Sequence, residues 1–199
     1  MFGTTWEEIV SIWVSGGICM IPLALVCLFI YTNVTRLWLD FANIGHAKVP
    51  EATWLGWIEN PAEGKGQIGE LIRFSQANVH NIDEVGRRFA EIQMLRVPDF
   101  DRRIVLLGIL VNVSPLLGLL GTVIGMLATF KVISTGGGNT IDLVADGIRV
   151  ALITTQAGLT IAIPGFFMAN AIKRKRNNYV GFLIRLESMT MQHFKKRLG

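Results

Sequence analysis

Hydrogen-bonding side chains recur in two long stretches of the sequence that carry no charge. Asn112, Thr122 and Thr129 lie in the first stretch, and Thr155 and Gln156 lie side by side in the second. Hydroxyl and amide groups can orient water or hydrogen-bond a carboxylic acid, but they do not titrate near pH 7. These residues therefore suit a polar pathway, or a surface along which a partner helix slides, and they do not supply a proton carrier.

These polar residues also have a purely structural interpretation. An isolated threonine in a membrane helix usually donates its hydroxyl to a carbonyl of its own helix. Gln156 is harder to explain in this way, because a primary amide in hydrocarbon needs a partner or water. Polar residues on two neighbouring helices together indicate a lumen or a sliding surface.

Small residues accompany the polar ones at helical spacing. Gly121 and Gly125 form a small-xxx-small pair, as do Gly118 and Thr122, and such pairs let two membrane helices approach closely. The residues expected to pack these helices together are Gly118, Gly121, Gly125, Gly158, Pro115 and Pro164.

The elements that must carry these residues follow from the distribution of charge. Only 17% of the 199 residues are charged, whereas about 25% is usual in soluble domains. Residues 9–35, 104–130 and 150–172 contain no Asp, Glu, Lys or Arg, and about 20 apolar residues are enough to cross a bilayer as a helix. The sequence thus excludes a soluble globule and predicts an all-α integral membrane protein with three transmembrane helices, extended by cytoplasmic helices.

The basic residues indicate the orientation of these helices. Residues 36–103 and 173–199 hold 17 of the 19 Lys and Arg, so the positive-inside rule places both segments in the cytoplasm. The N-terminus and the loop near residues 134–140 then face the opposite side of the membrane. The first stretch has no Lys or Arg before it and is longer than the apolar core of a secretory signal, so we expect it to be a retained helix.

The expected segments follow in order. They are the periplasmic N-terminus with the first transmembrane helix (1–38), a cytoplasmic helical loop (39–103), the second transmembrane helix (104–133), a periplasmic loop (134–141), the third transmembrane helix (142–172) and an amphipathic cytoplasmic tail (173–199). Within the loop we expect helices near residues 50–59, 67–79 and 82–96, with a bend at Pro98. The tail is expected to form a helix on or below the membrane surface.

Three ordered motifs resemble the MotA/TolQ/ExbB proton-channel family. They are Ser-Pro-Leu-Leu-Gly-Leu-Leu-Gly-Thr-Val-Ile-Gly at 114–125, Gly-Ile at 147–148 followed by Ala-Leu-Ile-Thr-Thr at 151–155, and Gly-Leu at 158–159 with Ala-Ile-Pro at 162–164. The three-helix layout is similar to the ExbB/TolQ branch. The MotA branch comes second, because its members have four membrane helices and a larger cytoplasmic insertion.

The resemblance implies a pentameric pore bundle in the bacterial inner membrane, around an ExbD/TolR-like single-span partner. It also implies a TonB-like or TolA-like transducer and work such as nutrient import, and it assigns the family's pore threonines to Thr122 and Thr155. One position departs from the family: Val150 stands where members commonly have Glu. A pore acid there cannot belong to this mechanism, and the adjacent Arg149 either pairs with an acid on a neighbour or extends to the membrane interface.

Because the three charge-free stretches contain no Asp, Glu or His, we hypothesise that the partner's helix supplies the proton-carrying acid. Alternatives from other classes are the stator of a gliding or other surface motor, and a non-conducting scaffold. An intramembrane enzyme is disfavoured, because the spans hold no Ser-His, paired-Asp or HExxH arrangement. No metal ligand spacing and no cofactor motif occur. The basic pI of about 9.3 is explained by topology signals and lipid contact, so no nucleic acid partner is expected.

Overall fold

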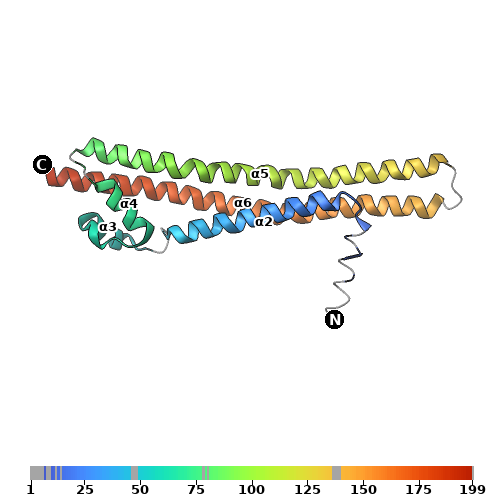
Figure 1. The fold of residues 1–199 in the computed structure, drawn as a ribbon, viewed down its shortest axis with the longest axis horizontal. Coiled ribbons are helices and arrows are strands. Elements are labelled where there is room, and N and C mark those ends of the chain that lie inside the picture. The colour runs from blue at the N-terminus through green and yellow to red at the C-terminus, as the bar shows by residue number, and fades with distance from the viewer. Residues whose placement is uncertain are drawn as a thin grey trace. The chain divides into compact units, whose positions relative to one another are not determined.

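The computed structural model describes residues 7, 10, 11, 13, 15–45, 49–77, 79, 81–135 and 140–198, and helices are the only regular secondary structure in this part of the chain. In chain order the elements are α2 (Met20–Ile44), α3 (Glu51–Glu59), the short 3-10 helix η1 (Pro61–Glu63), α4 (Gly66–Gln76), α5 (Ile82–Thr135) and α6 (Thr140–Leu198) (Figure 1). Residues 1–6 of the expected N-terminal segment and residues 136–139 of the expected periplasmic loop lie outside the described residues.

Three of the described helices are long and apolar enough to cross a membrane: α2, α5 and α6. Helices α5 and α6 each contain a whole charge-free stretch, and α2 contains residues 20–35 of the first one. Within such a stretch a helix satisfies its own backbone hydrogen bonds and needs no water. The prediction of an all-α membrane protein with three spanning helices is confirmed.

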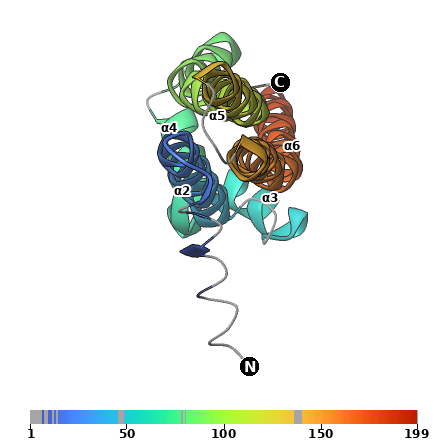
Figure 2. The same ribbon diagram turned by 90° about the vertical axis from the view of Figure 1, so that its right-hand side faces the viewer.

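The chain forms two compact units. The first, here called the apolar unit, comprises Met1–Asn33 and Leu106–Ala169. Within it α5 and α6 run side by side in opposite directions, with α2 as a third helix (Figure 2). A methyl group added at Gly165 of α6 would lie 3.0 Å from Val111 of α5 and 3.6 Å from Ile30 of α2. One glycine therefore packs against both neighbouring helices.

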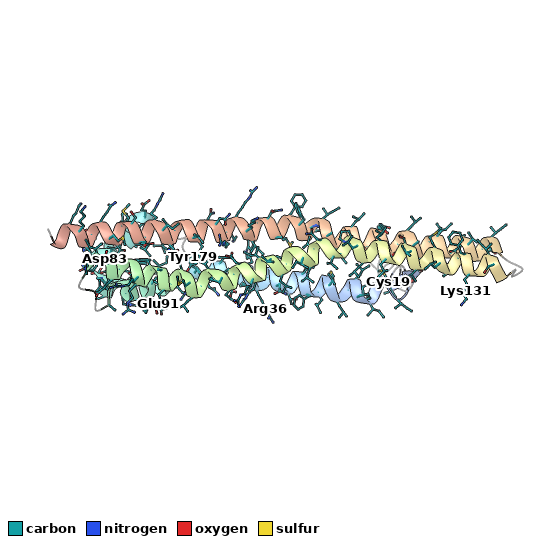
Figure 3. All side chains as sticks on the ribbon, turned by 90° about the horizontal axis from the view of Figure 1, so that it is seen from above. Cys19, Arg36, Asp83, Glu91, Lys131 and Tyr179 are labelled. Atoms are coloured by element: carbon teal, nitrogen blue, oxygen red, sulfur yellow. The ribbon has the colours of Figure 1, made fainter. Side chains whose placement is uncertain are left out.

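The second unit, here called the charged unit, comprises Val34–Val105 and Asn170–Gly199. Tyr179 of α6 is fully buried in it, between α5 and α6 (Figure 3). Its ring lies 6.0 Å from that of Phe100 and 6.4 Å from that of Phe41. Burial of this hydroxyl raises the pKa of Tyr179, and the nearby guanidinium of Arg96 opposes that rise. This aromatic cluster joins α2, α5 and α6.

The short helices pack against the long ones in the charged unit. Trp54 of α3 is buried with its ring edge-on to Phe182 of α6, at 5.8 Å. The amide of Gln76 in α4 donates to a carbonyl of α3 at 3.1 Å. Arg96 of α5 donates to Gln67 of α4 at 3.3 Å. A loop too small to form its own core is thus anchored on helices that continue from the membrane.

Helix α6 differs from the expectation for the tail. It continues without a break from the third span to Leu198, so the tail is not a separate helix. On its apolar face, Leu183 and Leu186 are fully buried within the charged unit. The sequence pattern correctly indicated one apolar face, and the covering surface is protein rather than lipid.

Helix α5 is also longer than expected. The predicted helix at 82–96 and the predicted span at 104–133 are one continuous helix that runs through Pro98. A proline inside a helix removes one N–H donor and leaves the carbonyl four residues earlier without its partner. Here that carbonyl belongs to Met94, which is 76% exposed. Because water can satisfy this carbonyl, the helix tolerates the proline.

Candidate functional site

The contact between α5 and α6 in the apolar unit is lined by glycine on both helices. A methyl group added at Gly158 would come within 2.7 Å of the Ser114 carbonyl oxygen, and one added at Gly118 within 2.9 Å of the Thr154 carbonyl oxygen. Backbones this close leave no space for a β-carbon, which is how small residues allow membrane helices to associate. Three further glycines also lie too close to the opposite helix for an unstrained β-carbon: Gly121, Gly125 and Gly147.

One carbonyl in this contact accepts hydrogen bonds from two adjacent threonines. The hydroxyls of Thr154 and Thr155 each lie 3.3 Å from the carbonyl oxygen of Gly118. The Thr154 hydroxyl also lies 2.9 Å from the carbonyl oxygen of Ala151 in its own helix. The same Gly118 oxygen accepts the backbone N–H of Thr122 within α5, as the α-helical pattern requires. Three donors therefore converge on one oxygen between the two helices.

The two predicted pore threonines lie on either side of this carbonyl. Thr122 is one helical turn beyond Gly118, and the Thr155 hydroxyl donates directly to Gly118. Both threonines are half-buried in the single chain, so one side of each remains accessible. The Thr122 hydroxyl donates to the Leu119 carbonyl at 2.7 Å, which is the local bond that threonine makes in membrane helices. The structure brings Thr122 and Thr155 together along α5 and α6.

Gln156 lies elsewhere, although it follows Thr155 directly. It lines a mainly apolar groove of about 490 Å³ between α2 and α6, together with Thr160 and side chains that include Leu23 and Cys27. Neighbouring residues in a helix point about 100° apart, which accounts for the separation. The sequence had led us to expect Gln156 in one polar pathway with Thr122 and Thr155. In the single chain, Gln156 instead lies in a different groove.

Thr129 and Asn112, the two other predicted pathway residues, are placed differently from each other. Thr129 is only 3% exposed and packs against Gly147 of α6. Its hydroxyl donates to the Gly125 carbonyl at 3.0 Å. Thr129 thus lies inside the α5–α6 contact, which is not the exposed pathway position that we expected from the sequence. Asn112 is exposed on α5.

The two prolines predicted to pack the helices lie inside continuous helices. Pro115 is half-buried in α5 and Pro164 is exposed in α6. Arg149 is exposed on α6 and forms no ion pair with any described residue. Val150, where the resemblance led us to look for a Glu, is half-buried and lies 3.7 Å from the site of a methyl group added at Gly17. An apolar side chain there contacts the N-terminal segment.

Sequence reasoning gave Thr154 and Gly147 no role of their own. Thr154 is fully buried and shares an acceptor with Thr155, and Gly147 faces Thr129. The available signal was spacing: residues 147, 151, 154 and 158 are small and recur at intervals of four, three and four. That period marks one helix face.

The chemistry of this site is restricted to hydrogen bonding. The stretches 104–130 and 150–172 hold no Asp, Glu or His, and proton relays in membranes use those residues. Within the described residues no group of three His, Cys, Asp or Glu side chains could hold a metal ion. The threonine pair can accept, donate and orient hydrogen bonds, and it contains no group that titrates near pH 7.

Comparison with known proteins bears on this arrangement. The family model described as the MotA/TolQ/ExbB proton channel family matches residues 69–183, more than half of the chain. The chain belongs to this family. The matched residues include the glycine contact, Thr122, Thr155 and most of the continuous helices α5 and α6.

Several relatives carry ExbB or TolQ names. The chain is 52% identical over 64 residues to biopolymer transport protein exbB1 of Vibrio cholerae (32% of this chain, 27% of the relative). It is 36% identical over 81 residues to Tol-Pal system protein TolQ of Haemophilus influenzae (41% and 36%). It is 32% identical over 109 residues to an ExbB homolog of Methanothermobacter thermautotrophicus (55% and 37%). The chain thus spans about a quarter to somewhat over a third of these relatives, and its assignment to the ExbB/TolQ branch is confirmed.

Proposed function

We propose that this MotA/TolQ/ExbB family member is the channel and stator subunit of a complex driven by the proton-motive force. In this proposal it conducts protons together with an ExbD/TolR-like single-span partner and powers TonB-type or Tol-type work on the outer envelope, such as nutrient import. Relatives named for biopolymer transport and for the Tol-Pal system support this assignment.

The assembly that we propose is a homopentamer in the bacterial inner membrane, with α5 and α6 lining the pore. Large apolar side chains are exposed on both helices of the single chain, among them Leu116, Leu119, Leu152 and Phe167. Such surfaces require lipid or further helices around them. The distribution of basic residues supports a cytoplasmic C-terminus and a periplasmic N-terminus.

One observation carries the mechanism. The Thr155 hydroxyl donates to the Gly118 carbonyl one helical turn before Thr122, whose own hydroxyl donates to the Leu119 carbonyl. No carboxyl or imidazole lies within the charge-free stretches around them. The proton-carrying acid must then come from the partner's helix, and the threonine hydroxyls hydrogen-bond that acid or its water as it passes. Protonation and release of the acid would move the partner helix, and this movement delivers the work.

Proton flux into liposomes tests the proposal. The chain is reconstituted with and without its partner, and internal pH is followed with a trapped dye after a potential is imposed. We expect flux only with the partner present. Thr122→Val and Thr155→Val keep the side-chain shape and remove the hydroxyl, so each should reduce flux at least tenfold while the complex still assembles.

Thr160→Val is the matched control, because Thr160 lies in the α2–α6 groove and donates to its own helix at 2.8 Å. This variant should conduct like the unmodified chain. Full flux from the chain alone would refute a partner-supplied acid. An assembled complex that conducts no protons under any condition would instead support the scaffold alternative.

A further inference from the structure

The net charge of the chain is concentrated in three short segments, here called the basic band. These are residues 36–40 of α2, 99–103 of α5 and 173–176 of α6. They hold seven Lys or Arg and three Asp, and the difference of +4 equals the formal net charge of the whole chain. Every segment borders a charge-free stretch, so the basic band lies at one edge of the apolar part of each spanning helix.

Contacts within the charged unit bring the three segments together. Asp40 of α2 lies 3.3 Å from Arg103 of α5, and Asp101 of α5 lies 2.6 Å from Arg176 of α6. The Lys175 ammonium of α6 lies 3.5 Å from the centre of the Trp38 ring of α2. The basic band is therefore one surface feature rather than three unrelated runs of charge.

Each acidic residue of the basic band forms an ion pair with an arginine of the band. Arg103 forms ion pairs with both Asp40 and Asp99, the latter at 2.9 Å. Arg176 forms an ion pair with Asp101. Two cations thus neutralise all three carboxylates. The remaining cations of the band have no acid left to pair with.

Four of these cations are exposed, and none forms an ion pair with a described residue. They come from all three spanning helices and are Arg36 (labelled in Figure 3), Arg102, Lys173 and Arg174. Trp38, 46% exposed beside them, is the residue type that prefers the boundary between headgroups and hydrocarbon.

We propose that the basic band is a binding surface for the headgroups of anionic phospholipids. Guanidinium groups match phosphate oxygens in geometry as well as in charge. Each Lys or Arg near an anionic membrane surface strengthens binding about fivefold. A topology signal alone needs only a number of cations near the span. The band also leaves its exposed cations without acids, at headgroup depth on all three helices.

Native mass spectrometry of the purified full chain tests this inference. The chain is titrated with phosphatidylglycerol and with phosphatidylcholine, and bound lipids are counted. We expect a preference for phosphatidylglycerol that weakens as salt increases. Lys173→Gln with Arg174→Gln should reduce phosphatidylglycerol affinity at least fivefold. Lys195→Gln with Lys196→Gln removes the same charge from exposed positions about 20 residues further along α6 and should leave it unchanged.

A second measurement keeps the proposal testable if the first variant does not insert. In the unmodified chain, phosphatidylglycerol should raise the melting temperature more than phosphatidylcholine does. Equal effects of the two lipids, or equal losses in the two double variants, would overturn the proposal. The proposal would also be overturned if soluble glycerol phosphate raised the melting temperature of the chain as much as the lipid does, because that would show a site for free phosphate. An acidic protein that co-purifies in place of lipid would also overturn it.

Discussion

The hydroxyl of Thr155 donates to the carbonyl oxygen of Gly118 across the α5–α6 contact, at 3.3 Å. Thr154 reaches the same oxygen at the same distance, so two hydroxyls compete for an acceptor that already receives a backbone N–H. Thr154 is fully buried, whereas Thr155 is half-buried. Only Thr155 can turn outward, and Thr154 can then keep the carbonyl satisfied. This relationship makes Thr154 a positioning residue for the proposed conduction.

Thr154→Val should reduce partner-dependent proton flux about fivefold, because one hydrogen bond contributes about 1 kcal/mol. When residue 154 has no hydroxyl, Thr155 is the sole side-chain donor to the Gly118 carbonyl and turns outward less readily. Valine has nearly the same shape, so packing against Gly121 persists. The flux assay in liposomes measures the effect.

Thr154→Ser supplies the control for this prediction, because it restores the hydroxyl and removes only a methyl group. Serine should recover most of the flux that valine loses. If serine and valine reduce flux equally, the methyl group matters rather than the hydrogen bond, and the positioning role is refuted.

Gly158→Ala should destabilise the α5–α6 contact by about 1–3 kcal/mol, as overpacking does. The added methyl group would lie 2.7 Å from the backbone oxygen of Ser114, which cannot move aside as a flexible side chain could. Thermal unfolding in detergent measures the loss.

Gly108→Ala is the matched control on α5, since a methyl group there meets nothing within 4 Å. Alanine is a better helix former than glycine, so this variant should be neutral or more stable by up to about 1 kcal/mol. Equal destabilisation by both substitutions would contradict a close glycine contact at Gly158.

Glu187→Gln should flatten the pH dependence of stability. Burial raises the pKa of Glu187 above its ordinary value of 4.5, and the hydrogen bond from Gln93 partly opposes this rise. The folded state therefore holds the proton more tightly than the unfolded state. The resulting stabilisation is complete below pH 4.5 and is lost as pH rises through the folded-state pKa.

Melting curves between pH 4 and pH 8 check this sign. The Glu187→Gln chain should lose less stability on the way to pH 8 than the unmodified chain. Glu63→Gln, at an exposed position, should follow the unmodified chain. A steeper loss in the Glu187 variant would show that the ionised form is the one favoured by the fold.

The spanning helices could be predicted because their signal is composition over many residues. The tail was harder, since an apolar face with Leu183 and Leu186 looks the same whether lipid or protein covers it. Pro98 was misleading for a different reason: a proline disrupts a helix only where the orphaned carbonyl has no alternative partner, and exposure of Met94 is a tertiary property.

Within the candidate site, helical periodicity could not tell which residues meet which neighbouring helix. Thr129 lies seven residues after Thr122, yet it is buried against Gly147 while Thr122 stays half-exposed. Gln156 lies beside Thr155 in sequence and lines the groove toward α2. Such assignments depend on the crossing of three helices, which no single-helix pattern contains.

The basic band also changes the meaning of the isoelectric point. Outside its three segments the chain carries equal numbers of basic and acidic residues, so the pI of about 9.3 is a property of 14 residues at the membrane edge. On a cation-exchange column, a detergent-purified chain would be retained through the basic band alone. Retention would then report how much of the basic band is covered by bound lipid. The same protein would elute differently before and after delipidation, without any change in its sequence or fold.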